Sequence, residues 1–164
     1  MFCVKLIVPT VLFAFSVKLF ESYTETMANI IHCCLLEQIT HINITKLLQL
    51  EISFSLLQIG KILNYYGIKK YNDIFDKTKN KIHQTTSVFS YFIIKGSLLF
   101  NIDKFVDFTG NDFIFGNKLD KYLKLINETL IDSQYMKHVD YFINYVNEHH
   151  FIKKTLRMTC LQIK

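Results

Sequence analysis

The chain has 164 residues, of which 50% are apolar and 20% are charged. This length is typical of one ordinary domain with a substantial core, and the composition excludes a disordered chain. The formal net charge of +5 comes almost entirely from lysine, since Arg157 is the single arginine. Nucleic-acid footprints usually contain arginines in a patch of one sign, so we expect no nucleic acid as a partner.

Residues 1–16 resemble a secretory signal peptide. A lysine precedes twelve residues without charge, Leu6 to Val17. The small residues of Ala14-Phe15-Ser16 suit a signal peptidase, so we expect cleavage after Ser16 and one mature, secreted domain over residues 17–164. The uncharged run is shorter than the about 20 residues that span a bilayer, which argues against a stable membrane anchor. The alternative is an intracellular protein whose translation starts at Met27.

Apolar residues at helical spacing predict an amphipathic helix over residues 26 to about 41, with Thr26 as its N-cap. The next helix, residues 46–66, has a wide apolar stripe, so we expect it to lie centrally in the core. Its expected N-cap is Thr45.

The central helix also carries signals for its packing and its end. Ser53 and Gly60 lie on its narrow polar strip and permit another helix to approach closely. Gly67 followed by Ile68 is typical of a left-handed helix stop with a hydrophobic contact just beyond it.

The remainder of the chain predicts further helices. Residues 88–100 favour a buried helix broken at Gly96, with a buried strand as the alternative. Other segments at helical spacing are one capped by Asn72 that extends to Phe89, residues 101–109, residues 119–130, and residues 133–152 capped by Ser133. The tail from Thr155 is a short strand or an extended strap. We therefore expect an all-α, single-domain helical bundle of four to five core helices.

An irregular region is expected between two of these helices. The turn signals Gly110-Asn111 and Gly116-Asn117 bracket the apolar residues Phe113-Ile114-Phe115. Phenylalanines around residues 89 to 115 also suggest an alternative function, in which they line a cavity for a lipid or small apolar ligand. Core packing is the competing interpretation, because large aromatic side chains ordinarily fill space.

Three cysteines remain after signal cleavage: Cys33, Cys34 and Cys160. Neighbours in a helix have Cα atoms about 3.8 Å apart, below the about 4.4 to 6.8 Å of disulfides, so Cys33 and Cys34 do not pair with each other. Because Cys34 lies on the apolar stripe, we expect Cys33 to pair with Cys160 in a secreted chain. The leftover thiol is then buried or joins two copies as a homodimer. In an intracellular chain all three are small core residues.

Two groups of polar residues are of the types that form metal or acid-base sites. Cys33, Glu37 and His41 recur every fourth residue, but the first and last are about 12 Å apart along a helix, so only a neighbouring pair can share an ion. His138 and His149 are similarly separated, and His149 and His150 diverge around the axis. We interpret these histidines as cations near a helix C-terminus. The sequence has no recognisable catalytic, cofactor-binding or metal motif, which disfavours an enzyme.

Two sequons become glycosylation candidates if the chain is secreted. Asn43-Ile44-Thr45 lies in a predicted interhelical loop and is the better site. Asn127-Glu128-Thr129 adjoins the apolar face of its helix. About one such triplet is expected by chance in this composition, so sequons alone indicate little about the compartment.

The expected architecture is similar to that of the four-helix cytokines, which share a signal peptide, this length, helices of this size and an early cysteine paired with a late one. The resemblance implies a protein that binds a protein partner or receptor and needs no cofactor. We expect the contact surface on the exposed side of residues 133–152, where Tyr135, Tyr141 and Tyr145 lie, because aromatic residues are enriched at interfaces. The competing interpretation is that these tyrosines cap the core.

Overall fold

The structure is a computed structural model that describes residues 19–76, 88–110, 118–149 and 156–161. Its α-helices are α2 (Leu19–Thr40), α3 (Ile44–Tyr65), α4 (Lys95–Phe100), α5 (Ile102–Thr109), α6 (Leu119–Leu130) and α7 (Ser133–Glu148). A 3-10 helix, η1 (Tyr71–Phe75), and a π-helix, η2 (Phe89–Ile94), complete the regular elements. These described residues contain no strand, so the predicted all-α class is confirmed, with six α-helices where four to five were expected.

Several predictions fall outside the described residues. They are the cleavage point after Ser16, the apolar stretch at residues 113–115, His150, and residues 77–87 of the predicted third helix.

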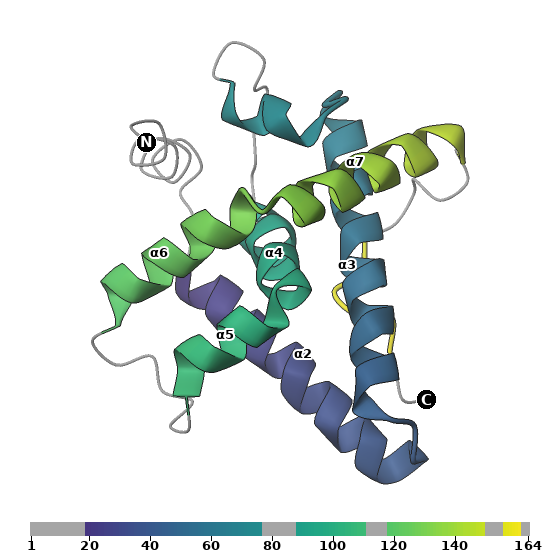
Figure 1. Ribbon diagram of the computed structural model, residues 1–164. Coiled ribbons are helices and arrows are strands. Elements are labelled where there is room, and N and C mark those ends of the chain that lie inside the picture. Colours follow the sequence, from purple (N-terminus) through teal and green to yellow (C-terminus); the bar gives the residue numbers. More distant parts are fainter. Residues whose placement is uncertain (1–18, 77–87, 111–117, 150–155, 162–164) are drawn as a thin grey trace.

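The helices pack as a bundle of crossing pairs (Figure 1). The helices α2 and α3 form a hairpin whose arms diverge from their shared loop, α7 crosses α3, and α6 and α7 follow each other along one side of α4. The main core is built from all of these elements, and its largest fully buried side chains include Tyr71, Tyr122, Tyr135 and Phe105. The tip of the α2–α3 hairpin has a small core of its own around Cys33. The hairpin tip is thus a partly separate packing unit.

The first helix is longer than predicted at its N-terminal end. Within the described residues α2 begins at Leu19, seven residues before Thr26. Thr26 is fully buried inside the helix, and its hydroxyl donates to the Ser22 carbonyl oxygen at 2.7 Å. The prediction of Thr26 as an N-cap was therefore wrong, because an intrahelical bond to the preceding turn satisfies the hydroxyl in place of a cap.

The second helix matches its prediction closely. It is capped by Asn43, not by Thr45, and the Asn43 side chain accepts from the Thr45 backbone N–H at 2.9 Å. At its other end Gly67 has a φ of 73°, and Ile68 N–H donates to the Leu63 carbonyl at 2.9 Å. This is the expected left-handed stop, and burial of Ile68 supplies its hydrophobic contact.

Residues 88–100 are helical, as favoured, but Gly96 does not break them. The π-helix η2 leads directly into α4, and Gly96 lies buried inside α4. A Cβ at Gly96 would lie 2.4 Å from Ile59 Cδ1 of α3, so the glycine permits close packing against α3. The predicted cap Asn72 likewise lies within η1, which begins after Lys70.

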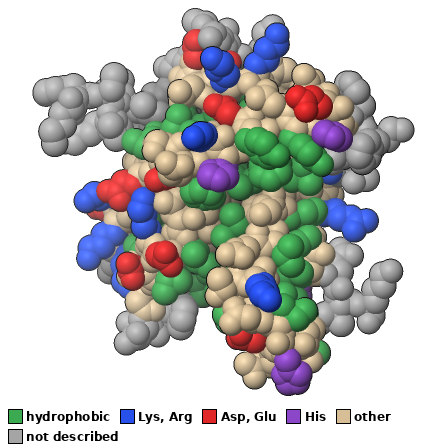
Figure 2. All heavy atoms as spheres, turned by 45° about the vertical axis from the view of Figure 1, so that its right-hand side comes forward, with side chains coloured by type: hydrophobic (Ala, Val, Ile, Leu, Met, Phe, Trp, Pro, Cys, Tyr) green, Lys and Arg blue, Asp and Glu red, His purple; other side chains and the backbone are tan. Residues whose placement is uncertain are grey.

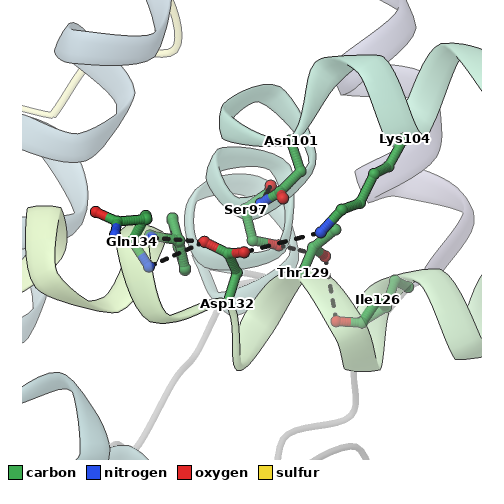
Figure 3. A network of polar contacts seen from close by, with 8 residues as sticks. Ser97, Asn101, Lys104, Ile126, Thr129, Asp132 and Gln134 are labelled. Atoms are coloured by element: carbon green, nitrogen blue, oxygen red, sulfur yellow. Dashed lines mark hydrogen bonds and ion pairs between the residues drawn. The ribbon is translucent and has the colours of Figure 1, made fainter.

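A polar contact set fixes the junction between α6 and α7 (Figure 3). Asp132 caps α7, and its Oδ1 accepts from the backbone N–H groups of Gln134 and Tyr135 at 3.1 and 2.9 Å. The cap is therefore Asp132, not Ser133 as predicted; a carboxylate also suits the positive end of the helix. Nearby, the buried hydroxyls of Ser97 and Thr129 lie 3.2 Å apart and join α4 to α6.

Candidate functional site: an apolar groove between α3 and α7

The face that comes forward in Figure 2 carries a cluster of hydrophobic side chains on the side where α3 and the end of α7 lie. A groove of about 460 Å³ lies between these two helices. It is lined by Leu50, Ser53, Phe54, Leu57, Tyr141, Phe142, Tyr145 and Cys160. Its size is at the lower end of the range for ligand sites, and its walls are helix faces.

The α3 wall is formed by residues spaced as one helix face. Leu50, Phe54 and Leu57 recur at intervals of four and three residues, which places them in a row. Leu50 is 54% exposed although it is a large aliphatic residue. The wall thus offers apolar surface that the described residues leave exposed.

The α7 wall is formed by stacked rings. Tyr141 stacks on Tyr145 with ring centroids 6.3 Å apart, and Tyr145 stacks on His149 at 4.2 Å. His149 Nδ1 lies 2.8 Å from the Tyr145 carbonyl oxygen, which fixes the imidazole ring over the tyrosine. Tyr141 is 61% exposed. The helix therefore presents a pre-ordered aromatic row, and a second hollow of about 410 Å³ continues it beside Tyr141.

Of the three tyrosines predicted as interface residues, Tyr135 does not belong to this surface. Its side chain is fully buried, and its hydroxyl donates to the Ile93 carbonyl oxygen at 3.0 Å. Burial raises the pKa of Tyr135 far above its usual value. Tyr135 is therefore a core residue, whereas Tyr141 and Tyr145 line the groove.

Cys160 also lines the groove, and it belongs to a strap from the C-terminal part of the chain, residues 156–161. Arg157 N–H donates to Gln58 Oε1 at 3.3 Å, and the N–H groups of Cys160 and Leu161 both donate to Glu51 Oε1 at 3.1 Å. The strap thus runs antiparallel to α3. Of the two forms predicted for this tail, the extended strap is the one observed.

Behind the strap lies a buried polar network that joins three helices. Glu51 of α3 is fully buried, and its Oε2 accepts from Asn29 Nδ2 of α2 at 3.3 Å. Asn29 Oδ1 in turn accepts from Lys95 Nζ of α4 at 3.3 Å, and Lys95 also donates to the Met158 carbonyl at 2.8 Å. Burial lowers the pKa of Lys95, while the negative charges of Glu51 and Glu25 oppose that shift.

Sequence reasoning missed this network, although its two charged members were visible. Glu51 lies four residues after Leu47 and four before Ser55, on the buried face of α3. Lys95 is a lone charge within the apolar run of residues 88–100. A charge on an apolar helix face indicates a buried partner, but nothing in the sequence identifies that partner.

The predicted Cys33–Cys160 disulfide is not formed, since all three described cysteines are free thiols. Cys160 Sγ instead donates to Glu51 Oε1 at 3.6 Å. Cys33 is buried in the small core of the hairpin tip, where burial and the charge of Glu51 raise the pKa of its thiol to about 12. Burial and Glu51 likewise raise the pKa of Cys160 to about 11. The disulfide prediction is corrected accordingly.

The structure does not bring together the candidate metal-binding and acid-base residues. Glu37 Oε1 accepts from the Ile44 N–H at 2.8 Å, and His41 has a φ of 58° just beyond the end of α2. His138 Nδ1 lies 2.7 Å from the Gln134 carbonyl oxygen. Among the described residues, no group of three or more metal-binding side chains gathers in one place.

The two sequons differ in accessibility. Asn43 is exposed at the start of α3. Asn127 is half-buried, its Nδ2 donates to the Leu123 carbonyl at 3.0 Å, and the hydroxyl-bearing Thr129 is fully buried. Glycosylation stays a prediction, and the structure favours Asn43 over Asn127 as an acceptor.

The proposed cavity for an apolar ligand finds little support among the described phenylalanines. Phe92 and Phe105 are buried in the main core, where the Phe105 ring packs 5.4 Å from that of Tyr23. These two rings fill space.

Comparison with protein-family models, curated proteins and solved structures gives no match for this chain. None of the described helices combines the length and apolar character needed to span a membrane.

Proposed function

We propose that this protein is a small, non-enzymatic helical binding protein that holds an apolar helix of a protein partner in the α3–α7 groove. The observation that carries the proposal is the pre-ordered row of Tyr141, Tyr145 and His149 opposite exposed Leu50. Tyrosines held in place by stacking bury a large area on binding at little cost in side-chain entropy. The groove is thus prepared for an apolar partner before binding occurs.

The groove favours a helix as its occupant because both of its walls are helices. A partner helix with apolar residues at i, i+4 and i+7 can interdigitate with Leu50, Phe54 and Leu57 by the same ridges-into-grooves packing as α3 and α7 themselves. None of the described residues that line the groove is charged, so recognition is expected to depend on shape and apolar area and to be insensitive to salt.

The test is selection of binders from a displayed library of amphipathic helical peptides on the folded protein. We expect peptides with helically spaced apolar anchors whose affinity falls at least about tenfold in Tyr145→Ala and in Leu50→Glu. Leu35→Glu, at an equally exposed leucine on α2, is the matched control and should bind normally. Selected peptides whose affinity ignores both groove substitutions would refute the assignment.

The compartment is a separate part of the proposal. Residues 1–16 support secretion, and a secreted partner or receptor would then be the target, as for a cytokine. The three free thiols instead fit a reducing compartment and the intracellular regulator that starts at Met27. Intact-mass analysis of protein made in secreting eukaryotic cells separates the two. A chain starting at Val17 and carrying glycan at Asn43 supports secretion, and an unglycosylated retained chain supports the regulator.

A further inference from the structure

The strap, residues 156–161, is held by buried polar side chains in the way that a bound peptide is held. Figure 1 shows it in yellow beside α3. Its anchoring groups are Glu51 and Gln58 of α3 and Lys95 of α4, whose exposed fractions are 0, 1 and 1%. No residue of the strap itself is fully buried. We call these three side chains, together with Ser55 of α3, the α3 slot.

The α3 slot binds mainly the backbone of the strap. It binds three N–H groups and one carbonyl group, namely the N–H groups of Arg157, Cys160 and Leu161 and the carbonyl of Met158. Two side-chain contacts add to these, since the Thr159 hydroxyl and the Cys160 thiol both donate to Glu51. Backbone groups are the same in every sequence, so another extended segment can make the same four hydrogen bonds.

Two apolar side chains of the strap give the slot a sequence preference. Met158 packs against the main core, and Leu161 packs against the small core of the hairpin tip. Between them lies Thr159, whose hydroxyl donates to Glu51. The slot therefore fits an extended segment in which a large apolar residue is followed directly by Ser or Thr, and two positions later by a second large apolar residue.

The slot also has a polar group that the strap leaves unbonded. Ser55 lies between Glu51 and Gln58 at intervals of four and three residues, so the three side chains share one face of α3. Ser55 is 3% exposed, and its hydroxyl has no hydrogen-bond partner among the described residues. Buried hydroxyl groups are normally hydrogen-bonded. The strap thus does not use the full hydrogen-bonding capacity of the slot.

We propose that the α3 slot is a peptide-binding site, that the strap is its intramolecular occupant, and that an extended segment of a protein partner replaces the strap. The strap is thus an autoinhibitory element. Glu51 and Lys95 gain the same backbone partners from either occupant, so the exchange does not leave a buried charge without a hydrogen bond. The proposal does not rest on the α3–α7 groove, which takes a helix, although Cys160 belongs to both sites.

The probe for the test is a peptide with the sequence of residues 156–161 and the change Cys160→Ser, acetylated and amidated at its ends. Residues 150–155 tether the strap to α7, so a free peptide must reach an effective concentration on the order of 1 mM to replace it. In an NMR titration of the isotope-labelled full chain, we expect the strap amide signals to move with a midpoint of about 1 mM peptide. Strap signals that stay unchanged at about 10 mM peptide overturn the inference.

Modified peptides test whether the contacts are those of the slot, and they need no change in the protein. N-methylation at the positions of Cys160 and Leu161 removes the two N–H groups that Glu51 binds, so the midpoint should rise at least about tenfold. Arg157→Ala in the peptide is the control and should bind normally, because the bond of Arg157 to Gln58 comes from the backbone. An N-methylated peptide that binds as well as the unmodified one overturns the inference.

A variant of the protein tests the strap as the competing occupant. Leu161→Ala removes an apolar anchor of the strap and leaves the slot itself unchanged, so the unmodified peptide should bind with a midpoint about tenfold lower. Tyr141→Ala, in the α7 wall of the groove, should leave the midpoint unchanged, which separates the slot from the groove. A midpoint that does not fall in Leu161→Ala, or that rises in Tyr141→Ala, overturns the inference.

Discussion

Gly60 of α3 lies directly against the backbone of Phe142 of α7. A methyl group added at Gly60 would lie 2.7 Å from the Phe142 carbonyl oxygen and 2.8 Å from its carbonyl carbon. No side chain fits there, so the glycine sets the distance between the two helices. The groove opens beside this crossing, and Phe142 is one of its lining residues.

Gly60→Ala should therefore destabilise the fold. The methyl group meets rigid backbone, and overpacking of this kind costs about 1–3 kcal/mol, which exceeds the about 1 kcal/mol that alanine gains in a helix. Gly96→Ala is the matched control, because its methyl group would meet the flexible end of Ile59. Urea unfolding should show the larger loss for Gly60→Ala. An equal loss in both variants would mean that α7 shifts freely on α3.

Glu51→Leu should be among the most damaging single changes. It removes the acceptor of the Cys160 and Leu161 N–H groups and of the Thr159 hydroxyl, and it leaves Lys95 buried without a nearby negative charge from α3. Breaking a buried charge pair costs about 3–5 kcal/mol.

The control is Glu128→Ala, which removes the exposed pair with Lys124 and should cost less than about 1 kcal/mol. Hydrogen exchange provides a second reading, since residues 156–161 should lose protection in Glu51→Leu before the rest of the chain does. Protection of the strap equal to that of wild type would show that Glu51 does not anchor it.

Asp132→Ala should weaken the start of α7. The carboxylate caps two backbone N–H groups, and loss of such a cap costs about 0.5–2 kcal/mol. Its ion pair with Lys104 at 3.8 Å is half-exposed, so Lys104→Ala should cost less. Asp132→Asn keeps the cap and should stay close to wild type in thermal unfolding. A loss in Asp132→Asn as large as in Asp132→Ala would assign the effect to the ion pair.

Stability should fall at alkaline pH in a manner that depends on Cys33. Its pKa is about 12 in the folded protein and 9.0 ordinarily, so between these values the unfolded chain has lost the proton that the folded chain retains. The stability that the protonated Cys33 thiol contributes to the folded state is therefore fully present below pH 9 and is lost as pH rises toward 12.

Cys33→Ala should reduce the fall between pH 9 and 10 by up to about 1.4 kcal/mol per pH unit. The buried tyrosines and Cys160 also have raised pKa values and contribute in this window. They are unchanged in Cys33→Ala, so the difference between the variant and wild type isolates Cys33. Cys34→Ala supplies the control at an exposed thiol, and the titration is done with reductant. A slope unchanged in Cys33→Ala would contradict the assignment.

Local signals predicted much of the fold because their causes are local. The stop at Gly67 depends on one residue that adopts a positive φ, and the close approach at Gly60 depends on one missing side chain. Both were confirmed. The predicted N-caps Thr26, Thr45 and Ser133 were wrong. Several polar residues lie near the start of each helix, and packing decides which of them becomes the N-cap.

The candidate site was less predictable because it depends on distant residues. Tyr135 lies four residues before Val139, on the core face of α7, and this spacing could have predicted its burial. Grouping it with Tyr141 and Tyr145 because all three are aromatic ignored the spacing. The groove could not be predicted because it exists only where α3 and α7 cross, and the sequence does not show which helices cross. The buried network needed donors to Glu51 that are 108 to 110 residues away along the chain.

That separation has a consequence for folding during synthesis. Glu51 and the hairpin that carries it leave the ribosome well before residue 161 has been made. Until then the carboxylate lacks the N–H groups of the strap, and burying it is costly. The α2–α3 hairpin is therefore expected to stay loosely packed and open to chaperones during most of translation, and to close around Glu51 only when the strap arrives.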